Sequence, residues 1–95
     1  METMTSPVVR NLAPLNNPRI AHVYRMIIHN KWIRLDQLAC AMGITNSVVK
    51  LYMTIICTRV LTNAHMETRL KRRKGFKSII AEYRLVVEPE DGAYL

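Results

Sequence analysis

The stretch that decides the fold is "LDQLACAMGITNSVVKLY", residues 35–52. Apolar residues recur at helical spacing through its first half: Leu35, Leu38, Ala39 and Met42. Gly43 follows, and glycine is the residue that most readily adopts the left-handed backbone found at helix ends. Asp36 near the start suits the positive end of a helix dipole. The stretch therefore predicts a helix that ends at a tight turn, with a second helix directly after it.

The second helix of this pair is expected to begin after Thr45, whose hydroxyl can accept a hydrogen bond from a free backbone amide. The run "ITNSVVKLYMTIICTRVL", residues 44–61, has helical periodicity. We expect its buried face to be Val49, Tyr52 or Met53, Ile56 and Val60. The opposite face is polar: Asn46, Ser47, Lys50, Thr54 and Thr58. Its many β-branched residues disfavour an isolated helix, so tertiary packing must stabilise it.

Upstream of the pair the sequence predicts an irregular arm, a helix and a short strand. Residues 1–16 lack a sustained period; their apolar residues could dock on the core or on a second subunit, but we expect a frayed terminus. Asn17 and Pro18 are typical of a helix start. The apolar stripe that follows is Ile20, Val23, Tyr24, Ile27 and Ile28, and Asn30 with Lys31 should end the helix. "KWIRL", residues 31–35, is compatible with a brief strand.

Downstream of Asn63 the period changes from helical to alternating. One face of the first run carries Ala64, Met66, Thr68 and Leu70, and one face of the second carries Ile79, Ala81, Tyr83, Leu85 and Val87. Two alternating runs around a loop that contains Gly75 predict a β-hairpin. The alternative is that residues 63–73 extend the preceding helix, in which case the basic residues there would form a helix face.

The order helix, short strand, helix, turn, helix and hairpin is that of an α+β winged helix-turn-helix. We therefore expect an irregular N-terminal arm at 1–16, one winged helix-turn-helix domain at 17–87 and an acidic tail at 88–95. Trp32 would plug the space between the first and second helices.

The charge of the chain indicates an anionic partner. Its formal net charge is +7, and the first 87 residues alone hold 14 basic against 4 acidic side chains, a net +10. The basic residues concentrate in "RLKRRKGFKS", residues 69–78, which we name the wing. A field of this sign favours nucleic acid or an anionic surface, and a wing of long cations on a hairpin suits phosphate contacts. The competing interpretation is a solvated basic loop that binds nothing in particular.

We predict double-stranded DNA as the partner, bound in the major groove by the third helix. The residues predicted to read base edges are Asn46, Ser47, Lys50 and Thr54. The residues predicted to contact phosphates are Arg34, Arg59, Arg69, Lys71, Arg72, Arg73, Lys74 and Lys77. Four short polar readers give modest discrimination, so a homodimer or a partner regulator would be needed for high specificity.

The segment "NKWIRLDQLACAMGITNSVVKLYMTII", residues 30–56, resembles the amino-terminal region of the CaiF/GrlA family of enterobacterial transcriptional regulators. The likeness extends by pattern over about residues 20–87. It implies a DNA-binding bacterial regulator of transcription, often an activator, and it matches Asn46, Ser47 and Lys50 to the start of the reading helix. Because the sequence indicates no signal peptide or membrane span, we expect a cytoplasmic, nucleoid-associated protein. The chain departs from the family in stopping at Leu95 and in having a less basic third helix.

Other function classes have weaker support in the sequence. A protein-interaction module would use Leu51 and Ile55, if exposed, and double-stranded RNA would use the wing without base readout. Cys40 and Cys57 lack the spacing of a disulfide framework or a metal motif and are expected to be small core residues, so we expect no metal and no cofactor. No catalytic constellation, small-molecule substrate, signal peptide or membrane span is indicated.

Overall fold

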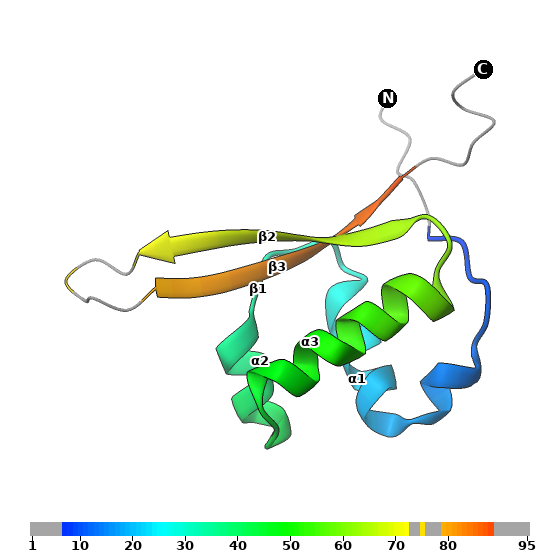
Figure 1. The fold of residues 1–95 in the computed structure, drawn as a ribbon, viewed down its shortest axis with the longest axis horizontal. Coiled ribbons are helices and arrows are strands. Elements are labelled where there is room, and N and C mark those ends of the chain that lie inside the picture. The colour runs from blue at the N-terminus through cyan, green and yellow to red at the C-terminus, as the bar shows by residue number, and fades with distance from the viewer. Residues whose placement is uncertain (1–6, 73–74, 76–78, 89–95) are drawn as a thin grey trace.

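The computed structural model describes residues 7–72, 75 and 79–88. The elements follow in the order η1 (Ala13–Asn16), α1 (Pro18–Ile27), β1 (Ile33–Arg34), α2 (Leu35–Met42), α3 (Asn46–Ile55), η2 (Ile56–Val60), β2 (Ala64–Arg72) and β3 (Ile79–Val87). The helices form one layer beneath a three-stranded sheet, and the β2–β3 hairpin extends past them at one end (Figure 1). This is the predicted α+β winged helix-turn-helix arrangement.

The helix starts follow the predicted capping chemistry. The Asn17 side chain accepts a hydrogen bond from the Arg19 amide at 2.9 Å, and the Thr45 hydroxyl accepts one from the Val48 amide at 3.4 Å. α1 ends at Ile27, earlier than predicted, so Ile28 lies beyond the helix and is 37% exposed instead of completing the buried stripe.

The turn between α2 and α3 depends on Gly43. Its φ is +68°, and its amide donates to the carbonyls of Ala39 and Cys40. The Ile44 amide also donates to the Ala39 carbonyl, at 3.0 Å. A left-handed residue that satisfies the last carbonyls is the usual end of a helix, and it lets the chain reverse into α3 within three residues.

The core lies where the three helices meet the inner face of the sheet. Its fully buried members are contributed by α1, α3, η2 and β3, and include Val23, Ile27, Val49, Ile56 and Leu85. On α3 the open choice between Tyr52 and Met53 is resolved, because Met53 is buried and Tyr52 is half-buried.

The sheet has the order β1-β3-β2 and is antiparallel throughout. The register pairs Met66 with Leu85 and Thr68 with Tyr83, and Tyr83 also pairs with Ile33 of β1. These residues share the inner face, as the alternation predicts. Residues 64–72 are thus strand, and the alternative of an extended helix is wrong.

The distal half of the hairpin has no helix beneath it (Figure 1). Leu70 and Ile79 belong to the inner face by register, yet they are 69% and 60% exposed. The stem of the wing therefore projects from the body of the molecule instead of packing on it.

Two features of the chain differ from the sequence expectation. Residues 7–16 are not frayed: Val9 forms a bridge with Leu61, the Val8 amide donates to the Asn63 side chain, and Leu15 packs on the core. The third helix also changes character at its C-terminal end, where Ile56–Val60 forms a π-helical turn. The arm supplies hydrogen-bond donors to the end of this turn, because the amides of Arg10 and Asn11 both donate to the Val60 carbonyl.

No single helix of the described chain is long and apolar enough to cross a membrane. Only the pair Leu35–Met42 and Asn46–Val60 meets the limits of length and composition, when the two are taken together across a 100° bend.

Candidate nucleic-acid interface

The exposed side of α3, together with η2, forms a polar face without acidic residues. Asn46, Ser47, Lys50 and Thr54, the predicted base readers, are all exposed on α3. Lys50 has no carboxylate within ion-pair distance among the residues that the structure describes. We name this set the polar face of α3. These residues are exposed, so a base edge or a phosphate could meet their side chains.

Thr54 differs from the other three predicted readers. Its hydroxyl donates to the Lys50 carbonyl at 3.0 Å, and Thr58 repeats the pattern with a 2.7 Å bond to the Thr54 carbonyl. Such back-bonding is common for threonine inside helices and uses the hydroxyl hydrogen. Thr54 is thereby left with a methyl group and acceptor capacity to offer a partner.

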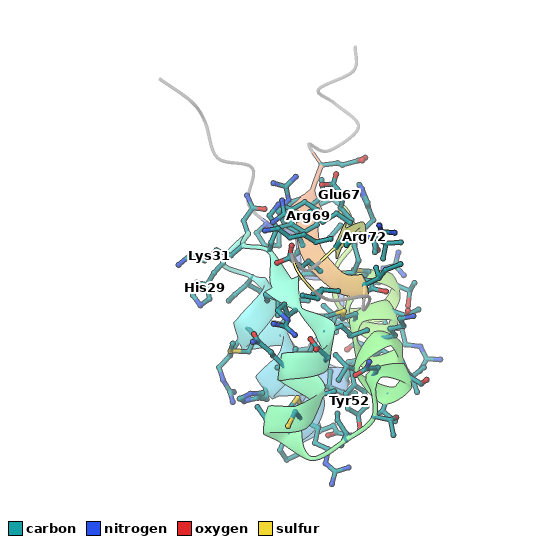
Figure 2. The ribbon with its side chains drawn as sticks, turned by 90° about the vertical axis from the view of Figure 1, so that its left-hand side faces the viewer. His29, Lys31, Tyr52, Glu67, Arg69 and Arg72 are labelled. Carbon is teal, nitrogen blue, oxygen red and sulfur yellow. The ribbon has the colours of Figure 1, made fainter. Side chains whose placement is uncertain are left out.

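The wing supplies the second part of the interface. Lys71 and Arg72 lie exposed at the end of β2, and Gly75 has φ +82°, which suits glycine in the loop. Figure 2 views the molecule from the wing end and shows Arg72 on the side of α3, whereas His29 and Lys31 lie on the opposite side. Arg73, Lys74 and Lys77, also predicted to contact phosphates, lie outside the described residues.

Arg59 and Arg10 add cations near the C-terminal end of α3. Arg59 is exposed on the π-helical turn. Arg10 donates from Nη1 to the Thr58 carbonyl at 3.1 Å, so the arm brings its charge to the same end. Arg10 is absent from the sequence prediction because a frayed arm is expected there; the available signal was Leu15, which packs on the core, whereas Val9 and Leu12 are exposed.

Two predicted phosphate contacts occupy a different surface. Arg34 makes a two-pronged ion pair with Asp36, at 3.1 Å from Nε and 2.7 Å from Nη2, and Arg69 donates to Glu82 at 2.8 Å. By strand alternation both arginines lie on the side of the sheet that faces away from the helices. We name this side the outer face; its charged and aromatic members are Trp32, Arg34, His65, Glu67, Arg69, Glu82 and Arg84, and Lys71, at the far end of β2, lies on the same side by alternation.

Trp32 is the centre of the outer face. The guanidinium carbons of Arg69 and Arg84 lie 4.2 and 4.7 Å from the ring centroid, and Arg84 also bonds Glu67 at 2.8 Å. Figure 2 shows Glu67 and Arg69 at the sheet end of the molecule, away from the helices. Trp32 thus packs against two cations on the sheet. Its ring also borders α1 and α2 beside Met26 and Leu38, so the plug between the first two helices stays a prediction. Alternation within each strand does not reveal this cluster, because the register is what places Glu67 opposite Arg84 and Arg69 opposite Glu82.

Among the described residues, three ionisable groups have clearly shifted pKa values. The hydrogen bond between Arg34 and Asp36 raises the pKa of Arg34 and lowers that of Asp36, so both stay charged over a wider pH range. Burial raises the pKa of the Cys57 thiol to about 11, which makes it a poor nucleophile at neutral pH. Cys57 packs against the core as predicted, whereas Cys40, expected there as well, is exposed. Within residues 7–72, 75 and 79–88, no three His, Cys, Asp or Glu side chains are grouped closely enough to hold a metal ion.

Comparison of the chain with protein-family models, with curated proteins and with solved structures found no match. The polar face of α3 and the wing are therefore interpreted from their own geometry and charge.

Proposed function

We propose that this chain is a DNA-binding regulator of transcription that reads the major groove with α3 and holds the flanking phosphates with the wing. The observation that carries the proposal is the distribution of unpaired charge. Lys50, Arg59, Lys71 and Arg72 have no acidic partner among the described residues, and they lie along α3 and the projecting hairpin.

This distribution suits a polyanion with a regular backbone. A recognition helix can enter a groove about 12 Å wide, and long cations on a rigid strand can reach the phosphates beside it. The proposal assigns base readout to Asn46, Ser47 and Lys50, with the Thr54 methyl group as an apolar contact. It assigns phosphate contacts to Arg59, Lys71 and Arg72, which are exposed, and to Arg73, Lys74 and Lys77 of the wing, which lie outside the described residues. Arg34 and Arg69 are left out because each is paired with a carboxylate.

The role in bacterial transcription rests on the resemblance to the CaiF/GrlA family, whereas the location in the cytoplasm and at the nucleoid is the expectation from the sequence. Few reading residues per chain favour a homodimer or a partner regulator for operator specificity.

The experiment that tests DNA binding is fluorescence anisotropy with a random duplex of about 25 base pairs across a salt series. Wild type should bind with micromolar affinity and a steep salt dependence. Arg72→Ala/Arg73→Ala should flatten the slope of log K against log salt by about two units, because two phosphate contacts are lost. Arg19→Ala/Arg25→Ala removes the same charge from the exposed surface of α1 and should leave the slope unchanged.

Two further arms separate the competing functions. Duplex RNA of the same length should compete poorly, because its deep, narrow major groove excludes a helix; stronger competition by RNA than by DNA would favour the RNA-binding alternative. Leu51, which is 55% exposed on α3, is the observation that favours a protein-interaction module, whereas Ile55 packs on the core. No binding to either duplex at low salt by folded wild-type protein would reject the proposal and leave that module as the alternative to pursue.

A further inference from the structure

A cavity of about 420 Å³ opens where α1, α2 and the β1 side of the sheet meet. Its apolar wall is formed by Met26, Trp32, Ile33, Leu38 and Ala41. The volume falls within the range of roughly 300–1,000 Å³ typical of small-molecule sites. The cavity contains none of the residues of the polar face of α3 and none of the wing.

Two polar side chains line this cavity, His22, which is half-buried, and Gln37, which is exposed to solvent. Neither side chain has a hydrogen-bond partner within the described part of the chain. An imidazole and a primary amide can each act as donor and as acceptor. The polar edge of a ligand that packs against Trp32 could therefore form hydrogen bonds with both His22 and Gln37.

The two charged side chains that line the cavity, Arg34 and Glu82, are each neutralised by an ion pair. Arg34 is paired with Asp36, and Glu82 is paired with Arg69. An ionic ligand would have to compete with these pairs, whereas a neutral ligand leaves them intact. The apolar wall, the tryptophan and the two free polar groups favour a flat ring that carries both a donor and an acceptor.

We infer that this cavity binds a neutral, planar heteroaromatic ring that carries both a hydrogen-bond donor and an acceptor, such as an aromatic amide. The site is separate from the DNA-binding surface. The cavity borders α2, the first helix of the helix-turn-helix, and β3, the strand that follows the wing, through Glu82. A molecule bound there contacts elements next to α3 and the wing, but not the DNA-binding residues themselves.

Nicotinamide is a suitable probe because it has a flat ring, an amide and no charge. The titration is followed by ¹H–¹⁵N NMR on the full chain, with the side-chain N–H peaks of Trp32 and Gln37 as readout. The chain has one tryptophan, so its indole peak is identified at once. We expect saturable shifts of both peaks with a Kd of about 1 mM, the strength that a ligand of this size can reach.

Ala41→Leu adds bulk to an exposed residue of the cavity wall and should weaken binding by at least about tenfold, since the side chain fills the space. Cys40→Leu adds bulk to the neighbouring exposed residue outside the lining and should bind like wild type. Thermal unfolding of both variants establishes that they are folded.

Three outcomes overturn the inference. Absence of saturable shifts with nicotinamide rejects the site. Tighter binding of benzoate at the same peaks rejects the neutral ligand class. Equal binding of cyclohexanecarboxamide rejects the requirement for a flat ring. These titrations contain no DNA, so none of the three outcomes bears on the proposed DNA-binding function.

Discussion

The outer face of the sheet and the surface formed by α3 and the wing contain similar residue types but use them differently. On the outer face each arginine has a carboxylate: Arg34 with Asp36, Arg69 with Glu82, and Arg84 with Glu67. On α3 and the distal end of β2, Lys50 and Arg72 have no such partner among the residues described. Pairing keeps the first surface locally near neutral, while the second retains its charge for an external anion. The position of three acidic side chains, Asp36, Glu67 and Glu82, therefore separates a structural cluster from a binding surface.

The largest effect is expected from reversing charge on the binding surface. Lys50→Glu/Arg72→Glu should reduce affinity for duplex DNA by roughly 100-fold or more, because two attractive contacts become repulsive. Anisotropy at one fixed salt concentration measures this, and circular dichroism should show an unchanged fold. Arg19→Glu/Arg25→Glu makes the same charge change on α1; an equal loss there would mean that only net charge matters, and the comparison between surfaces would fail.

The next effect is expected on the outer face and in stability instead of binding. Trp32→Ala removes the ring against which Arg69 and Arg84 pack, and should lower the free energy of unfolding by about 2–3 kcal/mol. Urea denaturation followed by circular dichroism measures the loss, and Trp32→Phe should restore part of it. A loss of DNA affinity without a loss of stability would instead place Trp32 in the binding surface.

The helix-turn-helix could be predicted from the sequence because its determinants are local. Asn17, Gly43 and Thr45 act within a few residues of their own positions, and the alternation of β2 and β3 is visible in each strand separately. The outer face could not be predicted in this way, since its pairs depend on the register that brings Glu67 beside Arg84 and Arg69 beside Glu82. Basic residues that looked alike in the sequence were therefore assigned a common role.

The same argument explains the arm. Its docking depends on Asn63 and on the π-helical turn, which lie about 50 residues away in the chain, and no periodicity within residues 7–16 reports them. The polar face of α3 was easier to identify, because a helix separates its faces by spacing alone. The hydrogen bond from the Thr54 hydroxyl to the Lys50 carbonyl, in contrast, follows only from the three-dimensional structure.

Gly43→Ala changes the connection between the helices without altering charge on either surface. No atom lies within 4 Å of the added methyl group, so the cost is that of the left-handed backbone alone, about 1–2 kcal/mol of unfolding free energy. Thermal unfolding measures it. If the variant still binds DNA more weakly at a low temperature where it is fully folded, the angle between α2 and α3 matters for binding as well. An unchanged stability would contradict the role of Gly43 in the turn.

The smallest effect is expected at Asp36, and it sharpens the comparison through pH. The hydrogen bond from Arg34 lowers the pKa of Asp36 in the folded state below its unfolded value of about 3.9. Its contribution to stability is therefore fully present above that value and is lost as the pH falls through it to the folded pKa. Asp36→Asn should be less stable than wild type near neutral pH, and the gap should narrow below about pH 4. Asp36 is exposed and Arg34 is partly exposed to solvent, so the gap is small. Urea denaturation of the two proteins from neutral to acid pH measures it, and high salt should reduce it further. Arg34 freed of its partner would add an unpaired cation to the outer face, so a steeper salt dependence of DNA binding in Asp36→Asn would show that pairing alone had kept this surface from binding.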